Sequence, residues 1–518
     1  MARRKVWGWG VEGDAPGADE VRGLRTHLGF GRDADAVETP TEPRLPPPRV
    51  GIPAELSDAA CDDAYDRARY GLGRSYLDVV RGMRGEIAHP PDFVVHAWTE
   101  DTVIRTLEWA AARRVAVTPV GGGTSVVGGI EAHPIEGGEG AIALALGAMD
   151  RVLEVDTVSR AARIQAGATG PRLEEQLRVH GLTLRFYPQS FELATLGGWL
   201  ATRAGGHFAT GPTHIDDLVQ GIRAVTPGAG VWQSRRLPGS GAGPSPDRLL
   251  LGSEGTLGVI TEAWVRVQPR PTERRSASIR FPDYFAAARA VRDIVQSGLR
   301  PANCRVIDAR EAALTFADDG SHALLLLGFE SGLDDQFQQA LTIAGGEPRI
   351  SGGGAGEWKD AFLRAPYLRD TFVVMGVLSE TFESAITWDR HDAFVREVQG
   401  TAEAVLRERC GAGSVTVRMT HAYPDGAAPY FTCLAPVEQG AEVDTWRAVK
   451  HAASEAILRG GGSITHHHAV GRDHRPWYER QRPEPFAAAL RGAKAAVDPV
   501  GILNPGVLSG ASPPPATR

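Results

Sequence analysis

The sequence lacks several features that would place it in a common functional class. Its four cysteines, Cys61, Cys304, Cys410 and Cys433, show no CxxC spacing, which argues against a zinc knuckle and against a disulfide framework. No run of apolar residues is long enough to span a bilayer. The net charge of −7 leaves no basic excess that would bind nucleic acid. Because no lysine follows a glycine-rich loop, a Walker-type phosphate loop is also excluded.

The remaining composition is typical of a cytoplasmic globular protein. The basic residues at positions 1–8 precede no apolar segment, so we expect no signal peptide. The chain has 518 residues, 42% of them hydrophobic and 23% charged, which predicts two or three domains with well-buried cores. We expect no nucleic-acid partner. Peripheral membrane contact and a homodimer stay open, because no amphipathic segment stands out.

The most informative stretch is an apolar strand-like segment, Val115–Val120, that ends at glycines and hydroxyl residues. Glycine adopts positive φ without a side-chain clash, so consecutive N–H groups can turn inward and bind an anion. This arrangement suits a pyrophosphate, whereas a mobile glycine turn is the alternative. The residues concerned are Pro119, Val120, Gly121, Gly122, Gly123, Thr124 and Ser125.

Two further turns of the same kind follow. Residues 188–206 contain two Gly-Gly pairs and several polar side chains, and residues 252–261 read GSEGTLGVIT before an alternating strand pattern. Three glycine-and-hydroxyl turns within one region predict a backbone wrapped closely around a long, phosphate-bearing cofactor. The candidate ligands in these turns are Gln189, Ser190, Glu192, Thr195, Thr202, Arg203, Ala204, Glu254, Gly255, Thr256, Gly258, Val259 and Ile260.

The order of predicted elements indicates an α+β protein. A strand at 93–95, a helix capped by Thr99 and the strand at 115–120 read as one βαβ-like unit. Strands near 141–146, 152–155 and 162–166 and a helix at 172–179 read as a second unit. Beyond the prolines at 269–271, strands and helices alternate in a pattern typical of a partly antiparallel sheet, which a glycine loop at 352–356 interrupts.

These motifs together resemble the FAD-linked oxidase superfamily, the vanillyl-alcohol-oxidase type of flavoprotein, and within it the alkyldihydroxyacetonephosphate synthase family of ether-lipid enzymes. The likeness covers nearly the whole chain. The glycine loop and the GSEGTLG segment are specific for the superfamily, whereas the triple histidine, the WDR motif and the tyrosine segment at 423–430 point to the synthase branch. The motifs are PVGGGTS at 119–125, QSFELAT at 189–195, TRA at 202–204, EGTLGVI at 254–260, WDR at 388–390 and HHH at 466–468.

The resemblance implies a two-subdomain PCMH-type FAD-binding domain plus an α+β cap domain with helices and a mostly antiparallel sheet. It implies bound FAD, and because no histidine precedes the loop where covalent members often carry one, we expect the FAD to be non-covalent. The expected division is an N-terminal helical or irregular segment at 1–85, the FAD-binding domain at 86–270, the cap domain at 271–460, a C-terminal segment that completes the active site at 461–510 and a disordered tail at 511–518.

The resemblance also implies a reaction: the acyl group of acyl-dihydroxyacetone phosphate is replaced by a fatty alcohol without net redox change. The substrate would thus be a small or lipid-like molecule. Tyr430 stands at the family's catalytic tyrosine and Arg305 at its active-site arginine, and Arg390 could clamp phosphate. A free tyrosine titrates near ~10, so Tyr430 would need nearby cations to act as a base. Tyr423 and Arg418 are the less favoured candidates.

Each of these residues also has a purely structural interpretation. Tyr430 could be a packed core aromatic, Arg305 could pair with Asp308 at the surface, and Arg390 could pair with Asp389. Two departures from the family pattern weaken the substrate assignment but not the flavin assignment: Ala469 stands where the synthases usually have glycine, and Pro429 precedes the tyrosine. Residues 206–211 also differ from the animal enzymes.

The triple histidine, His466, His467 and His468, is expected to orient and polarise the substrate beside the flavin. On a strand, His466 and His468 would face one way and His467 the other. An HxH pair is also a metal-ligand arrangement, with His474 and Asp473 nearby, but no cysteine pair or HExxH motif completes such a site. We therefore expect no metal.

Two other functions stay open from the sequence. The same cofactor domain would serve an FAD-dependent oxidase or dehydrogenase of a 2-hydroxy acid or another alcohol. A protein that uses the glycine turns only as structure, without catalysis, would lack the flavin absorption bands.

Overall fold

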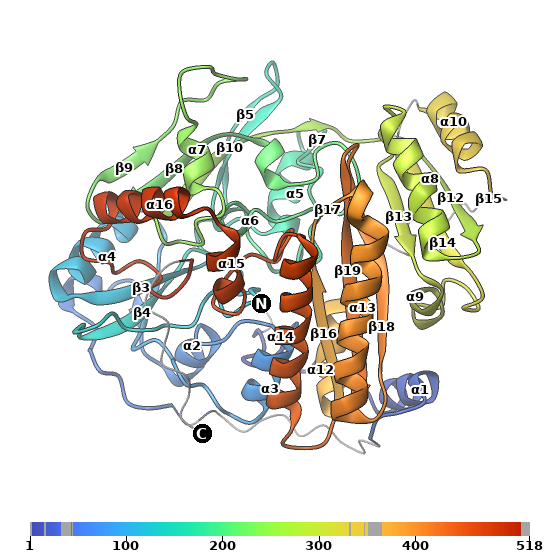
Figure 1. Cartoon of the computed structure of the whole chain (residues 1–518). Coiled ribbons are helices and arrows are strands. Elements are labelled where there is room, and N and C mark those ends of the chain that lie inside the picture. The colour runs from blue at the N-terminus through green and yellow to red at the C-terminus, as the bar shows by residue number, and fades with distance from the viewer. Residues whose placement is uncertain are drawn as a thin grey trace.

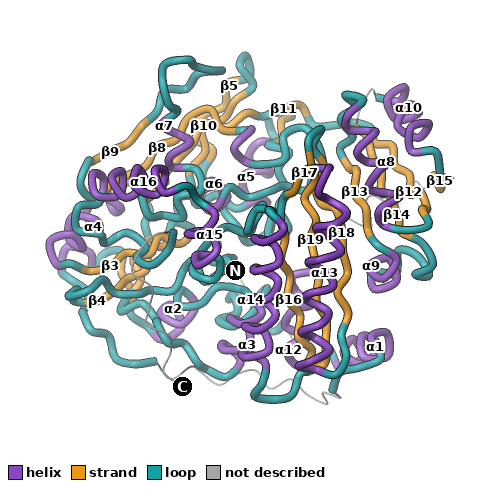
Figure 2. Tube along the Cα trace, in the orientation of Figure 1, coloured by secondary structure: helices purple, strands orange, loops and turns teal. Residues whose placement is uncertain are grey.

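The computed structural model describes residues 3–14, 17–32, 43, 45–330, 333–346, 348–350 and 365–508 (Figure 1). The predicted glycine loop at 352–356 and the predicted tail at 511–518 lie outside the described residues. The described part of the chain combines helices with three larger sheets and a small two-stranded one (Figure 2).

The first sheet contains the strand that leads into the glycine loop. Its order is β1-β2-β4-β3, with β4 parallel to both of its neighbours. We expected the strand near 141–146 to belong to a second unit together with the strands near 152–155 and 162–166, and that prediction is wrong. This strand is β4, which is buried along its whole length and lies between β2 and β3 as a central strand. The strands are β1 (Ala60–Cys61), β2 (Val94–His96), β3 (Val115–Val120) and β4 (Gly140–Ala145).

The second sheet is entirely antiparallel. Its order is β5-β6-β10-β8-β9, and β10 alternates buried and partly exposed residues, as a strand with one covered face does. A separate small ladder joins β7 to β11. The strands are β5 (Val152–Asp156), β6 (Ala161–Gln165), β7 (Leu182–Thr183), β8 (Val219–Thr226), β9 (Gly230–Gln233), β10 (Val259–Arg266) and β11 (Gln268–Pro269).

The third sheet is a large antiparallel one in the C-terminal half, and helices α8, α13 and α14 run along it in Figure 1. Its order is β15-β12-β14-β13-β18-β19-β16, and β17 pairs with β19. The strands are β12 (Arg274–Phe281), β13 (Asn303–Ile307), β14 (Ala323–Glu330), β15 (Pro348–Ile350), β16 (Val377–Glu383), β17 (Ile386–Thr387), β18 (Ser414–Ala422) and β19 (Gly426–Pro436).

Strand alternation divides the side chains of this sheet between two faces. Cys304, Val306, Phe431 and Cys433 belong to the hydrophobic core that the sheet shares with its helices. Because successive side chains on a strand point to opposite faces, the polar residues between them project to the other side. The sheet therefore offers one apolar face to its helices and one polar face to the rest of the molecule.

Several helices begin at a side-chain N-cap. Thr99 caps α4 by accepting from the N–H of Thr102, and Asp283 caps α8 in the same way. Within the described part of the chain, no helix is long and apolar enough to cross a membrane. The helices are α1 (Ala18–Leu28), α2 (Ala64–Arg69), α3 (Tyr76–Met83), α4 (Glu100–Arg113), α5 (Gly170–Arg178), α6 (Leu196–Thr202), α7 (Pro246–Leu250), α8 (Tyr284–Gln296), α9 (Ala309–Leu314), α10 (Asp334–Ala344), α12 (Leu368–Val374), α13 (Trp388–Cys410), α14 (Glu442–Gly460), α15 (Arg475–Gln481) and α16 (Glu484–Val497), with short 3₁₀ turns at Ala54–Leu56, Ile215–Asp217 and Ala365–Tyr367.

Candidate functional site

A cavity of about 750 Å³ lies between the glycine turns of the first half and the polar face of the large sheet. All three predicted turns contribute to its wall, through residues such as Gly121, Ser190 and Gly255. The opposite wall includes Arg305, on β13, and Tyr430, on β19. Segments far apart in the sequence thus enclose one space.

The glycines of the first turn are required by close packing. A Cβ on Gly122 would lie 2.0 Å from the carbonyl oxygen of Leu193, and a Cβ on Gly121 would lie 2.1 Å from Oγ1 of Thr195. Gly123 has φ of +67°, which glycine adopts without strain. The absence of side chains therefore lets the first turn pack directly on the second.

Most of the predicted cofactor residues line this cavity. Val120 and Val259 are instead buried in hydrophobic clusters, and Thr256 donates its hydroxyl to the carbonyl of Ser253. Glu192 and Arg203 are exposed, Glu192 bonded to Tyr367 and Arg203 paired with Asp216. The predicted residues that line the cavity are Pro119, Gly121, Gly122, Gly123, Thr124, Ser125, Gln189, Ser190, Thr195, Thr202, Ala204, Glu254, Gly255, Gly258 and Ile260.

Glu254 joins the third turn to the C-terminal segment. Its carboxylate accepts hydrogen bonds from the N–H groups of Val470, at 2.9 Å, and Gly471, at 2.8 Å. Burial raises the pKa of Glu254 to about 7. Asn504 adds a second link, because its Nδ2 donates to the carbonyls of Glu254 and Gly129. Residues near position 500 therefore tie together segments that line the cavity, Gly129 and Glu254.

Three neighbouring strands align Glu383, Tyr430 and Arg418 in one row. Tyr430 lies directly opposite Glu383 in the β16–β19 register and directly opposite Arg418 in the β18–β19 register. Directly opposed residues share a face of the sheet. All three side chains are almost completely buried. Sequence reasoning did not single out Glu383, because its strand reads as ordinary alternation.

The Arg418 guanidinium lies over the Tyr430 ring, 3.9 Å from its centroid. It also forms a buried ion pair of 2.6 Å with Glu311. Burial opposes the charged form of Arg418, but Glu311 and Tyr430 together outweigh burial and the pKa of Arg418 is raised. Arg418 therefore supplies a fixed positive charge beside the phenol ring.

Arg305 reaches the same cavity from β13. It is 1% exposed and donates to the carbonyl of His207 at 2.5 Å, so it is not a surface residue. Asp308, its suggested partner, instead accepts from the N–H groups of Glu311 and Val417. Burial, and then the nearby Arg418, lowers the pKa of Arg305 to about 9, so its guanidinium stays charged at neutral pH.

The triple histidine lies on a loop rather than on a strand, so the alternation expected for a strand does not apply. Glu383 organises this loop by accepting hydrogen bonds from the N–H groups of His466, His467, at 3.1 Å, and His468, at 2.9 Å. Burial raises the pKa of Glu383, but His468, His466 and these N–H groups outweigh burial, and the net pKa lies well below its ordinary value. An ionised carboxylate thus holds the loop in place.

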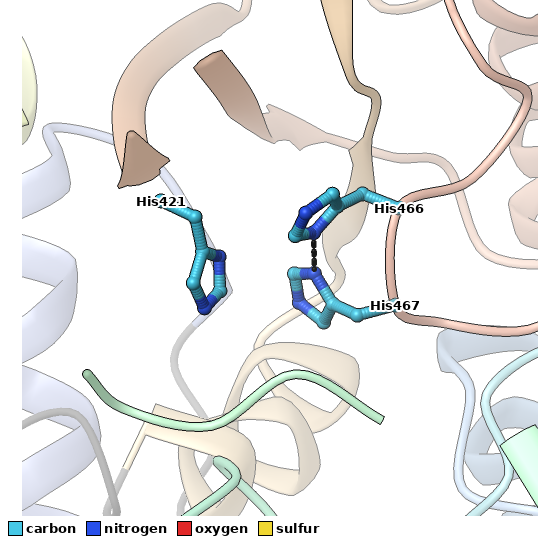
Figure 3. Close-up of side chains that lie close together, drawn as sticks. All are labelled: His421, His466 and His467. Atoms are coloured by element: carbon cyan, nitrogen blue, oxygen red, sulfur yellow. Dashed lines mark hydrogen bonds between the residues drawn. The ribbon is translucent and has the colours of Figure 1, made fainter. Parts of the chain in front are cut away.

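His467 and His468 line the cavity next to Tyr430, whose ring centroid is 6.1 Å from that of His467 and 5.4 Å from that of His468. His466 does not line the cavity and lies behind His467, with their Nδ1 atoms 2.9 Å apart (Figure 3). Sequence reasoning therefore grouped three histidines that occupy different positions.

A fourth histidine, His421, joins this cluster from β18 (Figure 3). A β-bulge between Met419 and His421 interrupts the alternation of β18, and both Thr420 and His421 line the cavity. The ring of His421 lies 4.9 Å from that of His466. Burial, and then His467, lowers the pKa of His421 well below its usual value. The bulge was not predictable from the sequence.

The nitrogens of His421, His466 and His467 lie close enough together to hold a metal ion. Several of them are engaged in hydrogen bonds, however. Nε2 of His421 contacts the carbonyl oxygen of Gly206 at 2.9 Å, and Nε2 of His466 contacts the Tyr423 hydroxyl at 2.7 Å. These contacts favour a hydrogen-bonded cluster over a metal site.

Arg390 does not lie at the cavity. It is exposed at the start of α13, near Gly461, and contributes nothing to the lining. Arg369, which sequence reasoning did not consider, does line the cavity, and its Nη1 donates to the carbonyl of Arg74 at 2.6 Å.

One end of the cavity is apolar. It is bounded by side chains from α1, from the end of α9 and from α12, which lie near one another in Figure 1. These side chains include Leu24, Leu314, Phe316, Leu368 and Phe372.

Comparison with known proteins assigns the chain to a family. Residues 91–234 match the FAD binding domain, and residues 270–508 match the C-terminal domain of FAD linked oxidases. The chain belongs to the FAD-linked oxidase family, and FAD is its cofactor. The predicted family, the PCMH-type FAD-binding fold and the α+β class are thereby confirmed.

Within this family, the chain is similar to alkyldihydroxyacetonephosphate synthases. It is 30% identical over 503 residues to that of Trypanosoma brucei brucei, covering 90% of this chain and 82% of the relative. Identity to the Dictyostelium discoideum synthase is 29% over 481 residues, covering 87% and 78%. A solved structure of alkyldihydroxyacetonephosphate synthase aligns with a TM-score of 0.80 at 25% identity, over 96% of this chain and 98% of that one.

The cavity fits a bound FAD. The glycine turns line it with backbone, and Thr124, Ser125 and Ser190 add hydroxyl donors. The volume is also within the range of a large organic ligand site.

Proposed function

We propose that the chain is an FAD-dependent enzyme of the alkyldihydroxyacetonephosphate synthase type. It exchanges the acyl group of acyl-dihydroxyacetone phosphate for a fatty alcohol, with no net redox change. The observation that carries this proposal is the position of Tyr430 between Arg418 and the histidine loop, in a cavity shared with the glycine cradle. When bound, FAD would supply an electron-poor ring.

Each side chain at the cavity has its own role in the proposed reaction. Tyr430 acts as general base on the carbon that bears the ester, and Arg418 compensates the negative charge that its oxygen carries as a base. Arg305 and Arg369 are the cations placed to bind the substrate phosphate, in place of the predicted Arg390. His467 and His468 orient the substrate next to Tyr430. The residues at the three glycine turns hold FAD.

The apolar end of the cavity supports a lipid-like substrate. A long alkyl chain gains about 0.8 kcal/mol for each methylene that it buries. The side chains from α1, α9 and α12 provide a surface for this burial. The phosphate of the substrate would therefore contact Arg305 and Arg369, and its alkyl chain would contact the apolar side chains of the same cavity.

We infer a cytoplasmic location from the four cysteines, which are all free. We also retain, as a proposal, the division of the chain at positions 85, 270 and 460, with residues 461–510 completing the active site. Peripheral membrane contact and a homodimer are compatible with this function.

The test is an anaerobic experiment on the purified holoenzyme. Acyl-dihydroxyacetone phosphate and a fatty alcohol should give an ether product and a free fatty acid, while the oxidised flavin spectrum is recovered at the end. A panel of D- and L-2-hydroxy acids should leave the flavin oxidised. Bleaching by a hydroxy acid without any ether product would instead identify an oxidase or dehydrogenase.

A further inference from the structure

Three histidines form a continuous chain of ring contacts from the cavity to a partly exposed position. Nδ1 of His467 lies 2.9 Å from Nδ1 of His466 (Figure 3). Nε2 of His466 lies 3.1 Å from Nε2 of His214. Nδ1 of His214 lies 3.0 Å from the carbonyl oxygen of Arg203. His214 precedes the 3₁₀ turn at Ile215–Asp217, more than 250 residues before the triple histidine in the sequence.

When all three rings are neutral, the carbonyl group of Arg203 determines which nitrogen of each ring carries the hydrogen. A carbonyl only accepts, so Nδ1 of His214 carries the hydrogen and its Nε2 presents a lone pair. Two lone pairs cannot face each other at 3.1 Å, so Nε2 of His466 carries a hydrogen and its Nδ1 accepts one from Nδ1 of His467. The remaining nitrogen, Nε2 of His467, is left unprotonated on the ring that lines the cavity.

A positive charge is unfavourable on the two inner rings, those of His466 and His467. Burial, and then His421 and His214, lowers the pKa of His466 well below its usual value. Burial, and then His468 and His466, does the same for His467. His214 is partly exposed, so water screens a charge there more effectively. When a proton binds to His467, the positive charge is therefore more favourable on His214 than on either inner ring.

We propose that His467, His466 and His214 form a proton relay that carries a proton from the cavity to the solvent side. The proton bonds to Nε2 of His467, and the Nδ1 hydrogen of His467 passes to Nδ1 of His466. The Nε2 hydrogen of His466 then passes to Nε2 of His214, which becomes the cation. The number of protons is conserved, and the positive charge moves across the three rings.

Tyr423 holds the central ring in both states of the relay. Its hydroxyl lies 2.7 Å from Nε2 of His466 and 3.1 Å from Oγ1 of Thr213. Burial raises the pKa of Tyr423 to about 12, so the hydroxyl keeps its hydrogen. That hydrogen points to Thr213 when Nε2 of His466 is protonated and to His466 when it is not.

Other charged and titratable groups surround the three histidine rings and determine the electrostatic potential at them. Those near the three rings are Glu383, His421, His468, Arg418, Tyr423, Arg203 and Asp217. The ionised Glu383, which binds the backbone of the loop, favours entry of a proton into the chain.

The relay deepens the proposed function, because removal of a proton from the substrate is the step that would feed it. Its first test does not depend on activity. In holoenzyme labelled with ¹⁵N-histidine, NMR at neutral pH should show His467 protonated at Nδ1 and not at Nε2. As the pH falls, the tautomers of His466 and His467 should switch together, at one and the same pH. A His467 that is protonated at Nε2, or rings that titrate independently, would overturn the relay.

The second test separates a relay from simple positioning. The amide of His214→Gln can donate to Arg203 and accept from His466, so the tautomers should stay unchanged at neutral pH, but it cannot take up a proton. We expect kcat to fall about 100-fold, the lower range for loss of an acid–base group, with KM and FAD content retained. The exposed His180→Gln should behave as wild type.

These outcomes also separate the relay from the proposed function. Wild-type kcat in His214→Gln would leave the histidines only a positioning role. If the wild-type enzyme makes no ether product, the proposed function fails, and the coupled tautomer switch still decides whether the relay exists.

Discussion

Arg418 and Tyr430 face each other across β18 and β19, with the guanidinium carbon 3.9 Å from the centroid of the phenol ring. The tyrosine that the sequence resemblance singled out therefore has a fixed cation beside it, as a tyrosine base requires. The register of these two consecutive antiparallel strands creates this pair.

Replacing Tyr430 with phenylalanine should remove the base and leave the fold intact. We expect Tyr430→Phe to lower the rate of ether formation at least about 100-fold, because general acid–base groups contribute this much. FAD content and melting temperature should stay close to wild type. The check is product formation by mass spectrometry, with Tyr478→Phe, whose ring packs outside the cavity, as the control. Near-normal turnover in Tyr430→Phe would assign the base to another group.

Adding one methyl group to the glycine loop should weaken FAD binding. In Gly122→Ala the new Cβ would lie 2.0 Å from the carbonyl oxygen of Leu193, so the first turn must move away from the second. Overpacking of this kind costs about 1–3 kcal/mol, which corresponds to roughly 5- to 150-fold weaker binding. The measurement is a titration of the apoprotein with FAD. Gly492→Ala, on α16 with open space around it, should bind FAD normally.

FAD should be released when the protein is denatured. Since no histidine precedes the glycine loop at the position that covalent family members often use, we expect acid precipitation to give a colourless pellet and a yellow supernatant. A yellow pellet would mean that a covalent bond to another residue had been missed.

Ala469 should be a point of backbone strain that glycine relieves. Its φ is +73°, in the left-handed region that glycine adopts without strain. This conformation costs a non-glycine residue roughly 1–2 kcal/mol, whereas glycine costs about 0.5–1 kcal/mol in lost chain entropy. Ala469→Gly should therefore raise the free energy of unfolding by up to about 1 kcal/mol in urea denaturation. Destabilisation would show that the Ala469 methyl group contributes more packing energy than the strain costs.

Acid should destabilise the protein below the usual histidine pKa. Burial lowers the pKa of His421, His466, His467 and His391, so these rings are neutral when folded and bind protons once unfolded. Stability is complete above about pH 6.5 and declines as the pH falls below it, by up to about 1.4 kcal/mol per pH unit for each ring. The depressed pKa of Glu383 adds a loss only at lower pH, below about 4.3.

Urea denaturation between pH 5 and 8 measures this slope. His391→Gln, which replaces a buried histidine outside the cavity, should reduce it, and His180→Gln, at an exposed position, should not. A stability that does not change over this range would mean that the buried histidines bind the same number of protons in the folded and in the unfolded state.

The sequence predicted those parts of the site that depend on local chemistry. The strand at 115–120 and its glycine loop follow from an apolar run that ends in residues without side chains, and the structure places β3 over Val115–Val120. Tyr430 and the triple histidine were reached through motif resemblance.

The rest of the fold and of the site depends on contacts between segments that are distant in the sequence. The position of β4 between β2 and β3 could not be read from order along the chain. Glu383 and His214 look like ordinary strand and loop residues until the fold places them against the histidines. Arg390, in a distinctive WDR motif, lies at the surface. Motifs thus identified the cofactor site better than they identified the groups around the substrate.

The link between β3 and the segment at 502–504 has a consequence for biosynthesis. Val117 and Asn504 pair along the backbone, and the Asn504 side chain bridges two of the turns that would surround the nucleotide. A ribosome must therefore deliver almost all of these 518 residues before the pocket is complete. Cofactor capture should thus follow translation, and a nascent chain that has not reached position 504 should remain colourless.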